Sequence, residues 1–290
     1  MKAKRRIALA QCAPRLGDVE HNLKLHLQWA EEAAAGSADL CIFPELSLTG
    51  YFLKDMVSEI AMSHDDKRWQ PLLDASRQVA LVVGVVVKDA DFRYYNAAAY
   101  LSGGAIRHIH RKVYLPTYGM FDEGRYFAEG DRVRAFDCDG VGAGILICED
   151  MWHLSAAYLL AAQGVHLLVC PSVSPGRGVL SSLHIDDLRS VAAWDDLCRT
   201  IAEFTTTYVV YCNRIGYEDG VTFHGGSSVH GPDGRQLLAA EQQEGLQMAD
   251  IDLREVERQR VATPLLRDEK FELTLRELQR IIDERTAGPY

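Results

Sequence analysis

The chain has 290 residues, 48% hydrophobic and 25% charged, with a formal net charge of −10. This balance is typical of a globular protein with a large core, and an acidic excess without a basic stripe argues against nucleic acid and anionic membranes as partners. Seven cysteines without a C-x-x-C pair favour reduced thiols over disulfides or a zinc site. The apolar run at 7–10 is too short for an export signal, and no run reaches membrane-span length. We therefore expect a cytoplasmic protein.

Strand-like and helical patterns interleave along the chain. Gly103-Gly104 and Pro232-Asp233-Gly234 predict tight turns between neighbouring strands. Interleaved strands and helices with a few direct hairpins indicate an α/β layered sandwich, and the absence of linkers or repeats favours one domain over 1–290. In chain order, the pattern predicts a strand over 6–13, a helix over 19–35, a strand over 39–43, a helix over 66–80, strands over 79–87, 97–102, 105–110 and 143–148, a helix over 153–163, a strand over 165–170, a helix over 185–205, strands over 208–213, 227–230 and 247–251, and an amphipathic helix over 268–285.

Cys148 ends the apolar run that begins at Gly142 and stands at the start of a polar turn. A thiol in this position is held on a rigid element and faces a cleft, as nucleophiles at strand-to-helix turns do. Cys170 also ends an apolar run, but Pro171 follows it and has no N–H to stabilise an oxyanion. Cys148 is followed by Glu149, whose N–H is available for that role. We therefore expect Cys148, and not Cys170, to be the nucleophile.

Glu45 and Lys112 stand at the ends of two other strand-like runs. A carboxylate in an apolar cleft is suited to taking the proton of a thiol, and a fixed ammonium stabilises a thiolate and an oxyanion. None of the ten histidines is marked by its context as a partner for the thiol. The ordinary alternatives are a surface carboxylate, a solvated lysine and a core cysteine.

Three segments together resemble the carbon–nitrogen hydrolase (nitrilase) superfamily: FPELSLTGY at 43–51, RKVYLP at 111–116 and ICEDMW at 147–152. The resemblance implies that Glu45 is the general base, that Cys148 is the nucleophile, and that Lys112 and the Glu149 N–H stabilise the oxyanion. It also implies that Glu123, shortly after Lys112, positions that lysine and the substrate. The implied fold is an α-β-β-α sandwich that dimerises into an αββα–αββα assembly, with the tail at 263–290 at the interface.

Within the superfamily, the segment at 112–123 and the Cys-Glu-Asp-x-Trp run most resemble the glutaminase domain of glutamine-dependent NAD synthetases. The resemblance implies that Tyr118 and Ser174 hold glutamine. This sequence departs from the pattern in two respects. The basic residue expected several positions after Ser174-Pro175 is displaced to Arg177, which is still suited to gripping a carboxylate. A synthetase domain that would consume ammonia is also absent from the sequence.

The resemblance implies a hydrolase that cleaves a non-peptide carbon–nitrogen bond through a cysteine thioester, without a metal or cofactor. The two departures lead us to expect a small amide or N-carbamoyl compound as its substrate. The alternative is a glutaminase-type hydrolase that supplies ammonia to a separate synthetase. A Cys–His thiol hydrolase and a non-catalytic binding module are further alternatives. We expect a narrow, dry pocket lined by Tyr51, Tyr118, Phe121 and Trp152, and a homodimer or larger homo-oligomer.

Overall fold

The computed structural model describes residues 3–176 and 189–287. The strands are β1 (Lys4–Gln11), β2 (Leu40–Ile42), β3 (Ala80–Lys88), β4 (Tyr94–Ser102), β5 (Ala105–Arg111), β6 (Phe136–Asp137), β7 (Gly142–Ile145), β8 (Leu167–Ser172), β9 (Tyr208–Asn213), β10 (Ile215–Glu218), β11 (Val221–His224), β12 (Ser228–His230), β13 (Gln236–Ala239) and β14 (Gly245–Asp252). The α-helices are α1 (Val19–Ala35), α2 (Val57–Ile60), α3 (Trp69–Ala75), α4 (Leu154–Ala162), α5 (Arg189–Thr205), α6 (Arg254–Ala262), α7 (Leu265–Asp268) and α8 (Phe271–Ala287), and the 3-10 helices are η1 (Lys54–Met56), η2 (Glu123–Arg125) and η3 (Cys148–Trp152).

Within these ranges the strands form two six-stranded sheets and a separate β10–β11 hairpin. The first sheet has the order β14-β1-β2-β3-β4-β5, with β1, β2 and β3 parallel. The second has the order β13-β12-β9-β8-β7-β6, with β7, β8 and β9 parallel. The carboxyl ends of parallel strands meet at one edge of a sheet, which is where α/β proteins place their sites. β5 is antiparallel to β4, which is antiparallel to β3, so the end of β5 lies at the same edge.

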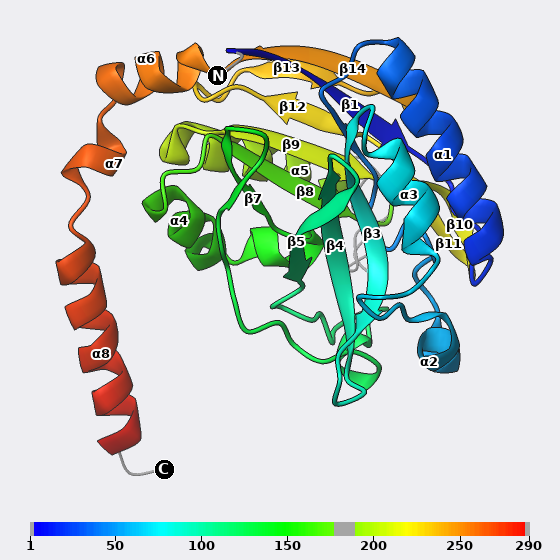
Figure 1. Ribbon diagram of the computed structural model, residues 1–290. Helices are drawn as coiled ribbons and strands as arrows, with labels where there is room; N and C mark the ends of the chain where they lie inside the picture. The colour runs from blue at the N-terminus through cyan, green and yellow to red at the C-terminus, as the bar shows by residue number, and fades with distance from the viewer. Residues whose placement is uncertain (1–2, 177–188, 288–290) are drawn as a thin grey trace.

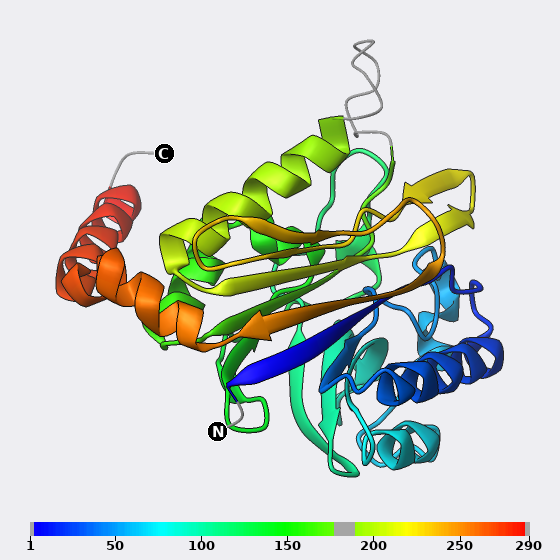
Figure 2. The same ribbon diagram turned by 90° about the horizontal axis from the view of Figure 1, so that it is seen from above.

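The two sheets pack face to face between two layers of helices. Figure 1 and Figure 2 show α1 and α3 on the outer face of the first sheet and α4 and α5 on the outer face of the second. Alternation along β1 fills both interfaces: Ile7 and Leu9 belong to the core between the sheets, whereas Ala8 and Ala10 pack in the layer with α1 and α3. The α-β-β-α sandwich predicted for this chain is therefore confirmed.

Most predicted boundaries differ from the structure by a few residues, and three of the differences change an element or the place of a cysteine. The helix expected over 66–80 is α3 alone, because the chain turns after Ala75 and enters β3 at Ala80. The strand expected to end at Cys148 ends at Ile145, and Cys148 begins η3. The strand expected over 165–170 is β8, which continues through Pro171 to Ser172. This extension places Cys170 inside a strand and brings Ser172 to the strand end.

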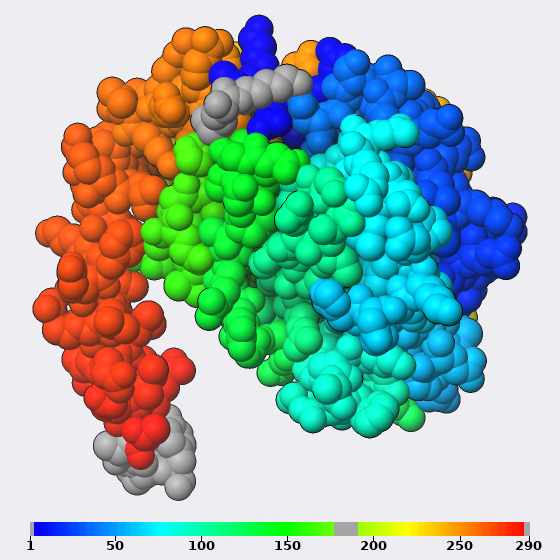
Figure 3. Space-filling view, viewed as in Figure 1, coloured from blue at the N-terminus to red at the C-terminus, as the bar shows by residue number. Residues whose placement is uncertain are grey.

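α6 and α7 pack against the sandwich, with Val256 of α6 fully buried, and α8 then extends away from it. Figure 3 shows α8 as an arm that projects from the body of the molecule. Its predicted apolar stripe is on the surface, with Leu275 70% exposed and Leu278 and Ile282 more than half exposed. A dimer built on this stripe remains a prediction. No helix in the described part of the chain is long and apolar enough to cross a bilayer.

Candidate active site

Glu45 lies in a tight turn that follows β2 and crosses the neighbouring strand β3. The crossing occurs at Gly84, where an added Cβ would lie 2.2 Å from the carbonyl oxygen of Pro44 and 2.3 Å from the nitrogen of Leu46. Real Cβ atoms do not approach backbone this closely, so glycine is the residue that fits here. Gly84 therefore sets the depth at which the Glu45 carboxylate enters the site.

Lys112 joins two carboxylates that come from distant segments. Its Nζ donates hydrogen bonds to Glu45 Oε1 and to Glu123 Oε1, both at 2.7 Å. All three side chains are buried, with at most 4% of each residue exposed. Buried charges are stable only when paired and hydrogen-bonded, and each carboxylate here has further donors. The structure thus brings together Glu45, Lys112 and Glu123, as the sequence predicts.

Asn96 and Tyr51 complete this cluster. The Asn96 amide donates to Glu45 Oε1 at 2.7 Å and to Glu123 Oε2 at 3.4 Å, and the Tyr51 hydroxyl donates to Glu123 Oε1 at 2.6 Å. Asn96 was not among the residues predicted from the sequence. The available signal was a single amide side chain in the otherwise apolar run of β4, fully buried and facing the charges.

Cys148 opens η3 with a φ of +43°, in the left-handed region that non-glycine residues rarely adopt. Such strain is typical of a nucleophile presented on a sharp turn. The first i→i−3 bond of this turn runs from the Asp150 N–H to the Ile147 carbonyl, so the Glu149 N–H precedes it and has no partner within the helix. Ser172 Oγ donates to Cys148 Sγ at 3.2 Å, and 9% of Cys148 is exposed.

Asp150 ties the Lys112 segment to the Cys148 segment. Its Oδ1 accepts the N–H groups of Val113 and Tyr114 at 3.0 and 2.9 Å. Its Oδ2 accepts the Ile147 N–H at 2.9 Å and lies 2.8 Å from His110 Nε2. This carboxylate holds the ends of two strands from different sheets. Asp150 lies within the Cys-Glu-Asp-x-Trp run, but no role was predicted for it from the sequence.

The charges of the cluster set the protonation of its members. Burial lowers the pKa of Lys112, but Glu123 and Glu45 more than offset this, so the pKa lies well above its ordinary value and the side chain is an ammonium. Burial raises the pKa of Glu123 to about 7, helped by Glu45 and opposed by Lys112 and Tyr51. Burial also raises the pKa of Cys148, and Glu45 raises it further. The resting thiol is therefore neutral and needs a base.

The side chains expected at the mouth of the site are more open than predicted. Trp152 is 44% exposed and packs edge-on against Trp194, and Tyr118 is 52% exposed. The Tyr118 hydroxyl donates to Glu149 Oε2 at 2.8 Å. Tyr51 is buried, and Phe121 packs edge-on between it and Tyr118. Of the side chains predicted to line a dry pocket, Tyr51 is therefore buried, whereas Tyr118 and Trp152 are about half exposed.

Ser174 lies close to the site, just beyond the end of β8. Its Oγ accepts the indole N–H of Trp194 at 2.7 Å, and its own N–H donates to Asn213. Val173, between Ser172 and Ser174, donates its N–H to Glu45 Oε2 at 2.9 Å and so fixes the second oxygen of that carboxylate. Arg177, the residue expected to grip a carboxylate, lies outside the described residues.

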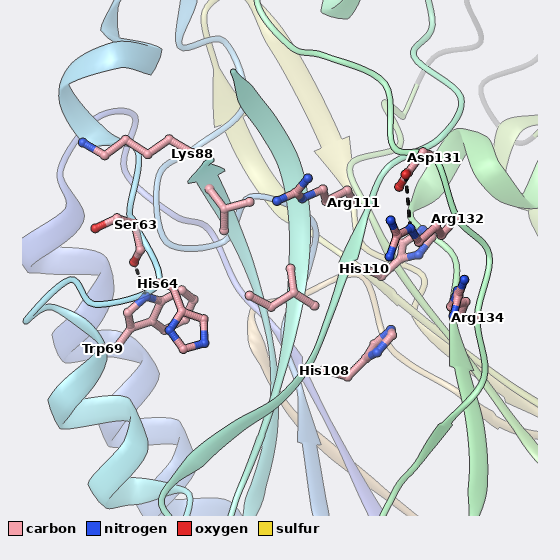
Figure 4. Close-up of a pocket in the computed structure, with 12 residues that line it drawn as sticks. Ser63, His64, Trp69, Lys88, His108, His110, Arg111, Asp131, Arg132 and Arg134 are labelled. Carbon is pink, nitrogen blue, oxygen red and sulfur yellow. Dashed lines mark hydrogen bonds and ion pairs between the residues drawn. The ribbon is translucent and has the colours of Figure 1, made fainter. Parts of the chain in front are cut away.

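A cavity of about 520 Å³ lies at the edge formed by β5, away from the Cys148 cluster. Figure 4 shows Lys88 on one side of this cavity and Arg132 and Arg134 on the other. Neither Glu45 nor Cys148 lines it. His110 lines it and also holds Asp150, so the cavity adjoins the support of the site but not the site. In the described ranges no group of three potential ligands is arranged to hold a metal ion.

Known proteins share the sequence pattern and the fold of this chain. The carbon–nitrogen hydrolase family model matches residues 6–261. The glutamine-dependent NAD(+) synthetase of Thermotoga maritima is 34% identical over 257 residues, which cover 86% of this chain and 42% of that protein. The corresponding enzyme of Acinetobacter baumannii, solved with ADP, superposes with a TM-score of 0.77 at 29% identity and covers 87% of this chain and 46% of its own.

A carbon–nitrogen hydrolase from Helicobacter pylori has a TM-score of 0.84 at 24% identity, covering 93% of this chain and 96% of its own, and shows the fold. The chain spans less than half the length of the NAD synthetases that it matches. The family model nevertheless extends over nearly all of the sandwich that carries Glu45, Lys112 and Cys148. The chain therefore belongs to the carbon–nitrogen hydrolase family.

Proposed function

We propose that this protein hydrolyses the side-chain amide of glutamine and releases ammonia for use by a synthetase. The observation that carries the proposal is the buried Glu45–Lys112–Glu123 cluster beside a neutral cysteine on a strained turn. The similarity to glutamine-dependent NAD synthetases supports glutamine over other amides. It favours the alternative of the sequence analysis over a simple amidase or N-carbamoyl hydrolase.

The reaction has two steps. In the first, Glu45 takes the thiol proton and Cys148 Sγ attacks the amide carbon, so that a carbon–sulfur bond forms and the carbonyl oxygen becomes an oxyanion. Glu45 then gives the proton to the amide nitrogen, the carbon–nitrogen bond breaks, and ammonia leaves a thioester. In the second, Glu45 takes a proton from water, the hydroxide attacks the thioester, and the proton returns to sulfur as the acid departs.

Stabilisation of the oxyanion is the part of the reaction that needs fixed positive charge. Lys112 is held as an ammonium by two carboxylates, so its position does not change as charge develops. The Glu149 N–H, at the start of η3, is the second donor in this proposal. Removing one such donor typically lowers kcat by about 10²- to 10³-fold.

We assign the recognition of glutamine to the part of the site around Tyr118 and Trp152, which are about half exposed. Tyr118 and Glu149 form one hydrogen-bonded pair there, and the Glu149 carboxylate is suited to pairing with the ammonium of an amino acid. Ser174 and Arg177 are proposed to bind the rest of the substrate, with Arg177 pairing with its carboxylate. Phe121 packs against Tyr118, and Trp152 packs against Trp194.

The test is ammonia release by the purified protein from glutamine, other ω-amides, N-carbamoyl amino acids and N-carbamoyl amines. We expect the highest kcat/KM for glutamine and none in Cys148→Ala. Mass spectrometry should trap an acyl adduct on Cys148, while Cys170→Ala should still form it. A preference for N-carbamoyl compounds would replace the proposed substrate, and an adduct on Cys170 would overturn the mechanism. Loss of turnover on replacing a histidine, but not Glu45, would support a Cys–His hydrolase.

We also propose a homo-oligomer in which the exposed stripe of α8 is covered by a second copy. The apolar side chains of this arm are at the surface, and large exposed apolar patches mark interaction sites. Sedimentation of the protein with Leu275→Glu and Leu278→Glu, compared with the unchanged chain, tests this. If the variant and the unchanged protein both sediment as monomers, the proposed homo-oligomer is refuted.

A further inference from the structure

A buried ion pair lies next to the site without belonging to the Glu45–Lys112–Glu123 cluster. Arg214, between β9 and β10, donates from Nη1 to Glu218 Oε2 at 2.7 Å, and both residues are at most 5% exposed. The guanidinium also stacks over the ring of Phe223 at 4.4 Å. Buried ion pairs rarely repay their desolvation by attraction alone, so the other contacts of this pair indicate what it does.

The second oxygen of Glu218 holds the loop that carries Tyr51. Glu218 Oε1 accepts the N–H groups of Tyr51 and Phe52, both at 2.8 Å. Gly50 permits this approach, because its φ is +78° and an added Cβ would lie 2.8 Å from Glu218 Oε2. A charged acceptor that binds two consecutive N–H groups fixes the backbone of a loop more firmly than neutral contacts do.

The Tyr51 side chain continues the connection into the site. Its hydroxyl donates to Glu123 Oε1, the same oxygen that accepts from Lys112. Displacement of the loop at residue 51 would therefore remove a donor from Glu123 and loosen the anchor of the ammonium. The titratable groups that face Glu123 are Lys112, Glu45 and Tyr51.

We propose that Glu218, held by Arg214, is a positioning residue for the hydrolase reaction, acting through Tyr51 on Glu123 and Lys112. This inference rests on the proposed function for its turnover measurements, and it adds residues from the β10–β11 hairpin to the machinery. The Arg214–Glu218 pair serves to orient the loop and only secondarily to hold the fold. Its loss therefore changes the pH dependence of the site as well as the stability of the protein.

The experiment measures the rate at which iodoacetamide alkylates Cys148, located by peptide mass spectrometry, from pH 5 to 9. This readout requires no amide substrate, so it is independent of the identity of the substrate. Ammonia release from glutamine is measured in parallel. The variants are Glu218→Ala, which removes the acceptor, Glu218→Gln, which keeps an acceptor oxygen, Tyr51→Phe, and the double variant of Glu218→Ala with Tyr51→Phe.

The matched control is Asp219→Asn. Asp219 adjoins Glu218 in the same hairpin, but it pairs with Lys54 at the surface, where the two side chains are 45% and 61% exposed. This variant should behave as the unchanged protein in both assays. It separates a specific effect of Glu218 from a general effect of altering the charge of the hairpin.

We expect Glu218→Ala to lower both rates by about 10- to 100-fold, as small misplacements of catalytic groups do. The pH midpoint of Cys148 alkylation in Glu218→Ala should rise by about one to two units, because the ionised form of Glu123 loses a hydrogen bond. Tyr51→Phe should change the two rates and the pH midpoint by as much as Glu218→Ala does. The double variant should be no slower than Tyr51→Phe alone. Glu218→Gln should recover part of the lost rate.

Two outcomes would overturn the inference. In one, the effects of Glu218→Ala and Tyr51→Phe multiply in the double variant. In the other, Tm falls while the pH midpoint of alkylation stays fixed, which would make the ion pair purely structural. If instead alkylation changes as expected but no variant or parent releases ammonia from glutamine, the positioning role stands and the proposed substrate fails.

Discussion

The contact between Gly84 and the Glu45 turn allows a quantitative prediction. In Gly84→Ala, the new Cβ would meet the Pro44 carbonyl oxygen at 2.2 Å and the Leu46 nitrogen at 2.3 Å. Ordinary contacts of this kind lie at roughly 3.4 Å or more, so β3 and the turn must separate by about 1 Å. Both partners are backbone, so no rotamer change relieves the clash. The displaced segment includes Glu45.

Two consequences follow from this displacement. Overpacking of a core costs about 1–3 kcal/mol, which should lower Tm by roughly 2–5 °C in a protein of this size. A shift of about 1 Å in the base should slow ammonia release and Cys148 alkylation by about 10²-fold. Thermal unfolding followed by circular dichroism and the two rate assays measure these effects separately.

Gly142→Ala is the control for this substitution. Gly142 also lies in a strand, β7, but an added Cβ there meets its nearest atom, His166 Nδ1, at 3.6 Å, an ordinary contact. We expect a stability change within about 0.5 kcal/mol and unchanged rates. If Gly84→Ala keeps the full alkylation rate and Tm of the parent, the argument that Gly84 sets the depth of Glu45 is refuted.

Three further predictions concern single side chains. Alkylation of Cys148 should speed up as pH rises through about 7, where Glu123 ionises, and Glu123→Gln should lack this inflection. Asp150→Ala should lower the free energy of unfolding by about 3–5 kcal/mol in urea titrations, because three backbone N–H groups and a buried histidine lose their hydrogen-bond partner. A loss under 1 kcal/mol would contradict this. Burial lowers the pKa of His26 to about 4 from 6.5, so the unfolded chain binds more protons between these values and stability should fall by about 3 kcal/mol as pH drops from 6.5 to 4. Urea titrations of His26→Gln should show a flatter pH dependence.

Local sequence patterns placed three candidate residues at the ends of strands, where the structure has them. Apolar runs that end in a single polar or reactive residue placed Glu45 and Cys148 after β2 and β7, whereas Lys112 follows the more polar edge strand β5. These patterns are readable because a strand buried on both faces is continuously apolar, and the first polar residue after it marks the edge of the sheet. The same logic marked Pro171 as an obstacle to a nucleophile at Cys170.

Contacts between segments that are far apart in the sequence required the tertiary structure. Asn96 bridges two carboxylates, and Glu218 holds the loop of Tyr51 from a hairpin near the other end of the chain. No local period encodes which face of β4 meets Glu45, because that depends on the register of β3 against β4.

The sequence by itself determined the fold class, the family resemblance and the three residues of the proposed chemistry. The structure alone decided how charge is distributed around them: which oxygen Lys112 contacts, that Cys148 is neutral at rest, and that Tyr118 and Trp152 remain half exposed. The physical reason is that side-chain type and strand period are local properties, whereas burial and pairing depend on which elements the two sheets bring together.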